Sequence, residues 1–289
     1  MKNTVLALAL LCLAASARAQ MPASWTNAVE PVRVAGNIYY VGTEDLGAYL
    51  IADEAGLVLL DVPLQNNVKL VLSNIEKLGF DPKTIRILIN SHAHVDHIGG
   101  FAAVKEKTGA KIVISAADAE LAARGGQDDF AFGDRFSYPP VKADRILKDG
   151  EVVRLGKIAM TAMITPGHTR GCTTWRTTVI ENNKPRDVVF LCSVTAPGYT
   201  LVNNAKYPQI FDDYRNSIAR LRKLDPDIFL GNHAGFFDLA TKLAKVREGG
   251  ANPFIVKGEF ATYLERAWKE LQEAEAKQRT PSPQTGTAH

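Results

Sequence analysis

The segment IRILINSHAHVDH, residues 85–97, decides the fold of this 289-residue chain. Its first five residues form a mainly apolar run that is typical of a buried strand. Three histidines and an aspartate then follow within six residues, at His92, His94, Asp96 and His97. A buried strand that ends in imidazoles is a rigid support for a metal site. Since residues i and i+2 point the same way in an extended chain, His92 and His94 can share one ion, and the last two members of the cluster can face a second.

Two further histidines stand in a similar setting, each after a predicted strand and beside small or polar residues. His168 follows a strand predicted over residues 158–164, and His233 follows one predicted over residues 228–230. A lone histidine such as His233 is more often structural than a ligand. The cluster favours ligation here, because an ion bound by three histidines needs one distant donor and a second ion needs another. Imidazole and carboxylate together suit zinc best, with iron and manganese as alternatives.

The rest of the chain alternates predicted strands and helices. Strands are predicted over residues 39–42, 48–52, 57–60, 85–89, 111–115, 152–155, 158–164, 173–180, 188–193 and 228–230. Helices are predicted over residues 66–78, 99–108, 214–224, 239–247 and 259–277. Residues 121–140 are rich in Gly, Asp and aromatic residues and are predicted to form a long loop. This mixture is typical of a layered α/β or α+β domain.

Composition and charge exclude several classes of protein. Hydrophobic residues make up 46% of the chain and charged residues 22%, as in an ordinary globular protein rather than a disordered, collagen-like or coiled-coil chain. The 34 basic and 31 acidic residues give a formal charge of +3, too weak a balance for a nucleic-acid surface. Beyond the N-terminus no apolar run reaches about 18 residues, so we expect no membrane span in the body of the chain.

Residues 1–19 have the pattern of an export signal. Lys2 gives a positive start, an apolar core follows, and Ala17-Arg18-Ala19 forms a small-x-small cleavage site. A buried N-terminal helix is the alternative, but the short apolar core and its flanks favour the signal. We therefore expect secretion through the inner membrane to the periplasm. We also expect one domain over residues 20–277 and a disordered tail over residues 278–289.

Cys172 and Cys192 are the two cysteines outside the expected signal. An oxidising compartment permits a disulfide between them, and two buried free thiols are the alternative. Both cysteines lie ten residues from Asn182, near which a predicted strand pair turns. Positions equally far from such a turn face each other, so we predict a disulfide.

The motif His92-x-His94-x-Asp96-His97 resembles the signature of the metallo-β-lactamase superfamily. The resemblance covers essentially the whole mature chain, and its further matching pieces follow in order at residues 57–61, 165–169, 190–193 and 231–233. It implies an α/β (α+β) fold, namely a four-layer αβ/βα sandwich in which two mixed sheets are flanked by helices. The metal cleft is then expected at one edge of the sandwich.

Ser193 narrows this resemblance to one branch. Enzymes similar to glyoxalase II and the lactonases carry a metal-bridging aspartate at that position. Metallo-β-lactamases of the first two subclasses carry a cysteine there and lack the histidine after the motif aspartate. Cys192 is one residue away, a shift that turns a side chain in a strand to the other face. The combination of His97 with Ser193 resembles the third metallo-β-lactamase subclass, as do residues 193–199 and 252–254.

The resemblance implies a metal centre with two zinc ions. The ligands it implies are His92, His94 and His168 for the first ion, and Asp96, His97 and His233 for the second. It also implies an exported β-lactamase that hydrolyses the β-lactam amide with a zinc-bound hydroxide and confers resistance to β-lactam antibiotics. Zinc lowers the pKa of its bound water towards about 7. Asp96 is the expected catalytic residue, because it anchors the second ion and orients the nucleophile.

Three further residues are expected to support this chemistry. Ser193 and Thr195 lie two residues apart and are expected to bind the carboxylate of the substrate, while the alternative is that both hydroxyls cap the loop before Pro197. Asp61 is expected to orient a ligand histidine, with turn capping as the alternative.

Two other functions stay open at this point. One is a dizinc hydrolase of another small ester or thioester, lactonase-like or glyoxalase II-like, against which Ser193 argues. The other is a non-catalytic zinc-binding protein, against which the complete ligand set argues, because a binder needs no open coordination position. We expect a monomer that acts on a small molecule, binds no nucleic acid and has no membrane anchor.

Overall fold

The computed structural model describes residues 21–280 of the chain. The expected export signal and residues 281–289 of the expected tail lie outside the described residues. Within residues 21–280, no helix combines the length and the apolar character that crossing a membrane requires.

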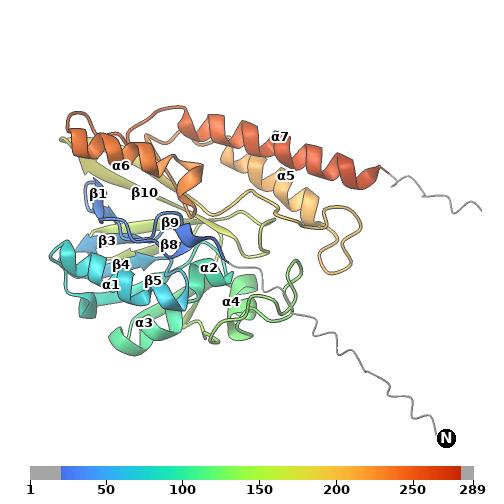
Figure 1. The fold of residues 1–289 in the computed structure, drawn as a ribbon, viewed down its shortest axis with the longest axis horizontal. Helices are drawn as coiled ribbons and strands as arrows, with labels where there is room; N and C mark the ends of the chain where they lie inside the picture. The colour runs from blue at the N-terminus through green and yellow to red at the C-terminus, as the bar shows by residue number, and fades with distance from the viewer. Residues whose placement is uncertain (1–20, 281–289) are drawn as a thin grey trace, which may run out of the picture.

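Two mixed sheets form the centre of the molecule (Figure 1). The seven-stranded sheet has the order β1 to β7, with β1 Val32–Ala35, β2 Ile38–Tyr40, β3 Tyr49–Asp53, β4 Gly56–Leu60, β5 Ile85–Ile89, β6 Lys111–Ser115 and β7 Arg145–Leu147. The five-stranded sheet has the order β12-β11-β10-β9-β8, with β8 Val152–Leu155, β9 Ile158–Ile164, β10 Thr173–Glu181, β11 Lys184–Leu191 and β12 Ile228–Gly231. Each sheet contains both parallel and antiparallel strand pairs.

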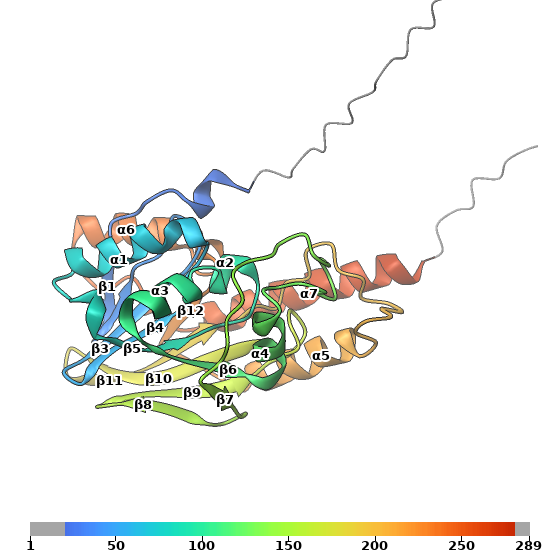
Figure 2. The ribbon, with the colours of Figure 1, turned by 90° about the horizontal axis from the view of Figure 1, so that it is seen from below.

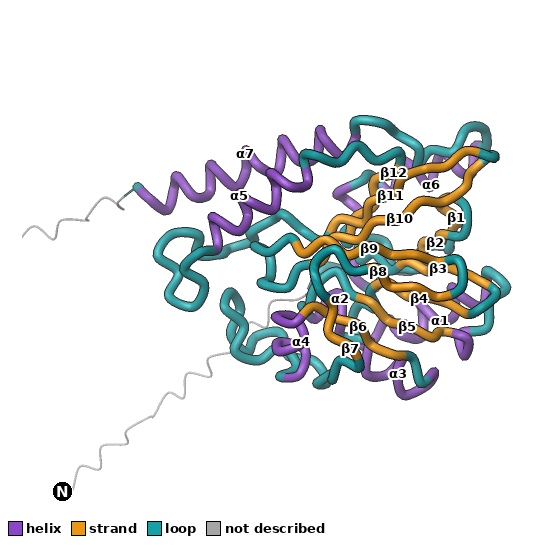
Figure 3. Tube along the Cα trace, turned by 180° about the vertical axis from the view of Figure 1, so that it is seen from behind, coloured by secondary structure: helices purple, strands orange, loops and turns teal. Residues whose placement is uncertain are grey.

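Helices cover the two outer sides of this pair of sheets (Figures 1 and 3). The helices beside the seven-stranded sheet are α1 Val68–Lys77, α2 Val95–Ile98, α3 Phe101–Thr108 and α4 Ala116–Ala123. Figure 2 shows α3 and α4 from below, with β6 and β7 next to α4. The other side carries α5 Ile210–Leu221, α6 Leu239–Glu248 and α7 Glu259–Arg279. Short 3-10 turns lie at Ala23–Trp25, Gln65–Asn67, Pro82–Thr84 and Ala234–Phe236. The predicted fold class, two mixed sheets flanked by helices, is confirmed.

The apolar pattern of the sequence accounts for two packed layers. Between the sheets, Tyr49 packs edge-on against Phe190 at 5.1 Å between ring centroids, and both are buried. Outside the seven-stranded sheet, Val71 and Ile75 of α1 belong to a second core with Leu88 of β5. Burial of each such side chain is worth about 1.5–3 kcal/mol, and β5 contributes to both layers, with Leu88 in the second core and Ile89 in the core between the sheets.

The strands place the candidate metal ligands at one edge of the sandwich. β4 and β5 run parallel, as do β11 and β12, so their carboxyl ends meet at the same side. Asp61 follows β4 directly, the histidine cluster follows β5, and His233 follows β12. The buried Trp175 of β10 donates its indole N–H to the carbonyl of Asn90 at 2.8 Å, which ties the end of β5 to the other sheet.

Some elements differ from the predictions. Four elements, β1, β7, α2 and α4, are absent from the sequence prediction. β1, β7 and α2 have only three or four residues each, and α4, with eight residues, is mostly alanine and has no stripe of large apolar side chains. The predicted loop over residues 121–140 begins with the last turn of α4. The final helix ends at Arg279 rather than residue 277, because the Gln278 side chain accepts a hydrogen bond from the Leu201 N–H at 2.7 Å. Residues 278 and 279 therefore do not belong to a disordered tail.

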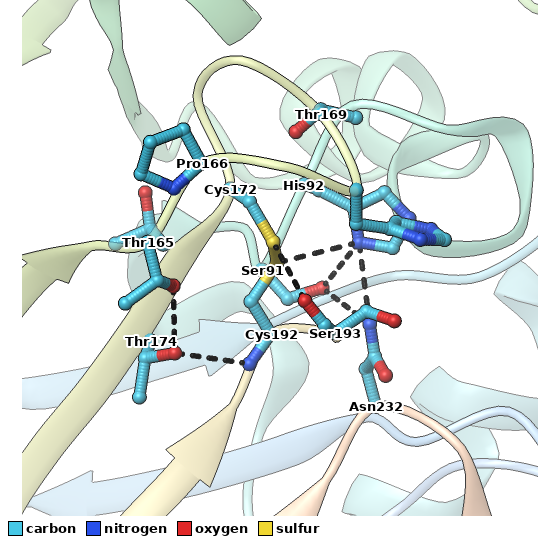
Figure 4. The surroundings of a disulfide bond; sticks show 12 residues. Ser91, His92, Thr165, Pro166, Thr169, Cys172, Thr174, Cys192, Ser193 and Asn232 are labelled. Atoms are coloured by element: carbon cyan, nitrogen blue, oxygen red, sulfur yellow. Dashed lines mark hydrogen bonds between the residues drawn. A yellow bond between two sulfur atoms is a disulfide. The ribbon is translucent and has the colours of Figure 1, made fainter. Parts of the chain in front are cut away.

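The predicted disulfide between Cys172 and Cys192 is present, with 5.9 Å between the Cα atoms (Figure 4). The register that suggested it is wrong by one residue. Glu181 pairs with Lys184, because Asn182 and Asn183 both have positive φ and form a two-residue turn. This register places Cys172 opposite residue 193 instead. The bond still forms because both cysteines lie just beyond the paired parts of β10 and β11, where the ladder no longer fixes the alignment.

Candidate metal centre

Five histidines and one aspartate meet at the edge where β5, β9 and β12 end. They are His92, His94, Asp96, His97, His168 and His233. Two sets of three offer ligand atoms that all lie within 4.8 Å of one another, namely His92 with His94 and His168, and His92 with Asp96 and His97. His233 joins the second set through its Nε2, which lies 3.5 Å from Oδ2 of Asp96.

In the three-histidine half of the centre, the rings of His92 and His168 are neutral and lie beside uncharged partners. Nδ1 of His168 lies 2.8 Å from the carbonyl oxygen of Thr195. Because a carbonyl only accepts, Nδ1 carries the proton and Nε2 is left as the ligand atom. Nδ1 of His92 lies 3.2 Å from Ser91 Oγ, which donates its own proton to Asp61 and can therefore accept the Nδ1–H, and this leaves Nε2 to the centre (Figure 4). Burial, and then the neighbouring histidines, lower the pKa of His92 and bring the pKa of His168 to about 3.

The second half contains carboxylates. Oδ2 of Asp96 lies 3.2 Å from Nε2 of His97 and 3.5 Å from Nε2 of His233, so three donor atoms converge. Nδ1 of His97 faces Asp61 at 3.3 Å, and Nδ1 of His233 faces Asp45 at 3.2 Å. Burial opposes a charge on His97, but Asp96 and Asp61 outweigh it and raise its pKa to about 10. Burial likewise acts against the charge of Asp96, but His97 and His233 hold the pKa of Asp96 well below its usual value.

Unsatisfied nitrogen atoms show that these residues fit a cation. Nε2 of His92 and Nε2 of His97 are buried and have no hydrogen-bond partner among residues 21–280. Leaving a buried polar atom unpaired costs about 1–3 kcal/mol, so the fold maintains these atoms at a cost that a bound ion would offset. Five imidazoles with one carboxylate are a donor set that suits zinc.

The backbone between the first two histidines is clamped from both sides. The N–H of Ala93 donates to Oδ2 of Asp118 at 2.9 Å, and its carbonyl accepts the hydroxyl of Tyr138 at 2.6 Å. Asp118 also accepts the N–H of Gly171 and the hydroxyl of Thr169, which ties the loop of His168 to the histidine cluster. Burial raises the pKa of Asp118 to about 6. The clamp therefore holds the backbone that carries His92, His94 and His168 in place.

A cleft of about 530 Å³ opens onto the centre. Four of the six residues of the centre line it: His94, Asp96, His168 and His233. The remaining wall is largely aromatic, with Trp25, Phe132, Phe136, Tyr138 and Phe236, and it also includes Arg135 and Thr195. A concave, mainly apolar space with a few polar groups at one end is typical of a site for a small organic molecule.

The expected substrate residues occupy different depths. Thr195 lines the cleft, whereas Ser193 is buried, and its Oγ lies 3.0 Å from Thr195 Oγ1. Ser193 Oγ also accepts the backbone N–H of Thr195 at 3.2 Å. Asp61 lies where an orienting residue is expected, beside His97, and it also accepts the N–H and hydroxyl of Ser91 at 2.6 Å each.

Sequence reasoning missed three carboxylates that support the centre: Asp45 beside His233, Asp129 beside His94, and Asp118, which holds the backbone of Ala93. Each is isolated in sequence from the histidine motif and belongs to no repeating pattern.

The comparisons with known proteins agree with this geometry. Residues 48–233 match the family described as the Metallo-beta-lactamase superfamily. The native FEZ-1 metallo-beta-lactamase from Legionella gormanii is 40% identical, with a TM-score of 0.87 over 89% of this chain and 99% of that one. BJP-1, a subclass B3 metallo-beta-lactamase of Bradyrhizobium japonicum, is 38% identical, with a TM-score of 0.84 over 88% of this chain and 97% of that one.

Curated relatives point to a second activity within the same family. A hydroxyacylglutathione hydrolase of Hyphomonas neptunium is 32% identical over 114 residues, which cover 39% of this chain and 35% of that protein. The first curated relatives are matched over only about a third to a half of their own length.

Proposed function

Since the chain belongs to the metallo-β-lactamase superfamily and is a hydrolase of that superfamily, we propose that it is a zinc-dependent β-lactamase with two zinc ions. The observation that carries the proposal is the pair of donor sets at the floor of an aromatic cleft. Similarity over nearly the full length of two metallo-β-lactamases, one of them of subclass B3, supports it.

In this proposal the two halves of the centre each hold one ion. The first ion is held by His92, His94 and His168, and the second by Asp96, His97 and His233. Zinc bound there supplies a Lewis acid that polarises a carbonyl oxygen and activates water. Three protein ligands per ion leave a coordination position for water or substrate.

Asp96 is the protein group that acts closest to the reaction. Its carboxylate lines the cleft and is held ionised by His97 and His233. An ionised carboxylate only accepts hydrogen bonds, so it can fix the orientation of the attacking water while it holds the second ion. Asp61 and Asp45 keep the proton of each neighbouring histidine on Nδ1, which directs both Nε2 atoms towards Asp96.

Different walls of the cleft would bind different parts of the substrate. The aromatic side chains suit the apolar substituent of a β-lactam, while Thr195 Oγ1 can donate to the carboxylate beside the ring nitrogen. Ser193 supports this contact from behind, because its Oγ accepts the Thr195 N–H and lies beside the Thr195 hydroxyl. A hydrogen bond to a charged group is worth about 1.5–3 kcal/mol, and less where water competes.

Export and domain organisation belong to the same proposal. Residues 1–19 would direct secretion to the periplasm, where the disulfide can form and where β-lactams reach their targets. Residues 20–277 would then act as one catalytic domain and confer resistance. Expression in a susceptible bacterium should raise the lethal concentration of a penicillin, and removal of residues 2–19 should abolish that protection while the protein stays active in lysates.

A substrate panel tests the function. The full chain is assayed with a penicillin, a cephalosporin and a carbapenem, and with a lactone and an acylglutathione, each with and without a chelator. We expect at least one β-lactam to reach a kcat/KM of about 10⁴ M⁻¹s⁻¹ or more, with the lactone and thioester at least about 100-fold lower. Faster turnover of the acylglutathione than of every β-lactam would instead favour the thioesterase activity of the partly matching relatives.

A further inference from the structure

Arg135 lies in the segment between α4 and β7, on the wall of the cleft. Its backbone N–H donates to the carbonyl of Phe132 at 3.2 Å, which places the residue at the end of a turn. Its guanidinium carbon lies 4.9 Å from the centroid of the Phe136 ring, and the side chain is exposed. The cation is therefore supported by the aromatic wall while its N–H groups stay accessible.

A row of rings connects this cation with the metal centre. Phe136 packs edge-on against Phe132 at 5.3 Å between centroids, and Phe132 packs against His94 at 5.2 Å. The exposed Arg135 and the buried His94 thus stand at opposite ends of one row, and both line the cleft. Arg135 is placed to contact the part of a ligand that lies farthest from the metal centre.

The acidic residues close to Arg135 in the sequence have other partners. Asp128 pairs with Lys206, and Asp134 accepts the backbone N–H of Asp128 at 2.8 Å. Oδ1 of Asp129 accepts two backbone N–H groups, also at 2.8 Å. Within residues 21–280, no carboxylate forms an ion pair with the Arg135 guanidinium. A guanidinium has five N–H donors and no acceptor, so this one is available to an anion in the cleft.

Arg135 is also the one lysine or arginine among the described residues that line the cleft. The carboxylates of the lining, at Asp45, Asp96 and Asp129, each lie beside a histidine of the metal centre. Negative side chains therefore gather at the inner end of the cleft, and the positive one stands alone at the outer end.

We propose that Arg135 is a specificity-determining residue, which binds a second anionic group on the acyl substituent of a β-lactam. This inference rests on the proposed function, in which Thr195 binds the carboxylate beside the ring nitrogen and the aromatic wall binds the substituent. A carboxylate at the end of that substituent can accept two parallel N–H groups of the guanidinium. The preferred substrates are then dianionic β-lactams.

Three penicillins test this preference, because they differ in one group on the same benzylic carbon. That group is a hydrogen in benzylpenicillin, an ammonium in ampicillin and a carboxylate in carbenicillin. Values of kcat and KM are compared between wild type and Arg135→Gln, so that the intrinsic reactivity of each compound cancels. We expect KM for carbenicillin to rise about 3- to 10-fold, KM for benzylpenicillin to stay within about twofold, and KM for ampicillin to stay level or fall. All kcat values should change less than about twofold.

Two controls separate recognition from a change in net charge. Arg215→Gln removes the same charge from the exposed surface of α5, where Arg215 pairs with Asp212, and it should leave all three KM values unchanged. Arg135→Lys keeps the charge and should retain part of the preference. Raising sodium chloride from about 0.05 to 0.5 M should shrink the difference between wild type and Arg135→Gln for carbenicillin, since salt screens an exposed charge pair.

Two results would overturn the proposal. An equal rise of KM for all three penicillins in Arg135→Gln would mean that Arg135 binds the carboxylate beside the ring nitrogen. Unchanged KM values for all three would mean that it binds neither anion. Arg135→Met, whose apolar chain can still cover Phe136, replaces Arg135→Gln if that variant does not fold.

The outcomes also distinguish this inference from the proposed function. Wild-type protein that hydrolyses none of the three penicillins contradicts the function. Calorimetric Kd values of the same compounds then test Arg135 by itself: a rise confined to carbenicillin in Arg135→Gln supports the inference, and any other pattern overturns it. Hydrolysis of all three penicillins with no selective effect of Arg135→Gln overturns the inference and leaves the function standing.

Discussion

The two halves of the metal centre hold their histidines by different means. His92 and His168 are buried, neutral and hydrogen-bonded to uncharged groups. His97 lies between the carboxylates of Asp96 and Asp61, which raise its pKa to about 10. None of the three proposed ligands of the first ion is a carboxylate, so an ion there would keep more of its charge for polarising a carbonyl. The second half compensates charge, which allows a second cation to stay close to the first.

Loss of a ligand in the neutral half should have the largest effect. His168→Ala removes one of three proposed ligands of the first ion, and we expect kcat/KM to fall at least about 10³-fold, because Lewis-acid stabilisation is worth several kcal/mol. Metal analysis should find one zinc ion per chain. Two ions still bound in this variant would show that the first half has been assigned wrongly.

A change in the charged half should be smaller and confined to the second ion. Oδ2 of Asp45 contacts both Trp25 and Nδ1 of His233, so Asp45→Asn can keep an oxygen at that place but removes the negative charge that strengthens the hold on His233. We expect the Kd of the second zinc to rise about tenfold, with the first Kd unchanged. An equal rise in the Kd values of both ions would mean that the two halves do not act separately, and it would contradict the comparison drawn above.

Substrate capture should change without any loss of metal. Thr195→Val removes the hydroxyl that lines the cleft and should raise KM about five- to tenfold with kcat nearly unchanged, since one hydrogen bond to a partly solvated carboxylate is lost. Ser193→Ala should have a smaller effect in the same direction, because Ser193 acts through Thr195. Loss of the second zinc in Ser193→Ala would identify Ser193 as a ligand and refute its proposed role.

The far end of the sandwich offers a control that spares the metal centre. The buried Glu181 accepts two hydrogen bonds from Arg33 and one from the Gly36 N–H, and these contacts, Arg33 first, lower its pKa below the ordinary 4.5. The stabilisation is therefore present above about pH 4.5 and is lost as the pH falls through the lower, folded-state value. Glu181→Gln should lower the free energy of unfolding by about 1 kcal/mol at pH 7, because the exposed Arg33 weakens the pair.

Denaturant titrations at pH 7 and pH 3 check this prediction, with zinc content as the second readout. The difference between wild type and Glu181→Gln should shrink at pH 3, and both should bind zinc equally. A difference that grows towards low pH would contradict the sign of the pKa shift.

Much of the fold, and the histidines of the metal centre, could be predicted from local sequence patterns. β5, β6, β8 and β9 have the predicted bounds, because each is a strand with a clear apolar or alternating pattern. The residues that the structure gathers at the metal centre stand at ends of such strands, where topology brings them together. Edge strand β7, with three residues, has no pattern long enough to detect.

The carboxylates that hold the metal centre from distant loops could not be predicted in the same way. Asp45, Asp118 and Asp129 reach the centre through tertiary packing, and no short-range spacing relates them to the histidine motif. The strand pair of the cysteines shows a subtler limit, since the choice between a turn at Asn182 and one shared with Asn183 shifts every partner by one residue. The backbone conformation at the turn decides between these two registers, and the amino-acid sequence alone does not.

The most direct test of the central claim is a zinc titration of the metal-free full chain, followed by native mass spectrometry and by penicillin hydrolysis in the same samples. The account predicts two zinc ions per chain, hydrolysis that appears as zinc binds, and loss of hydrolysis when a chelator removes the metal. Full penicillin hydrolysis by protein that carries no metal would contradict it.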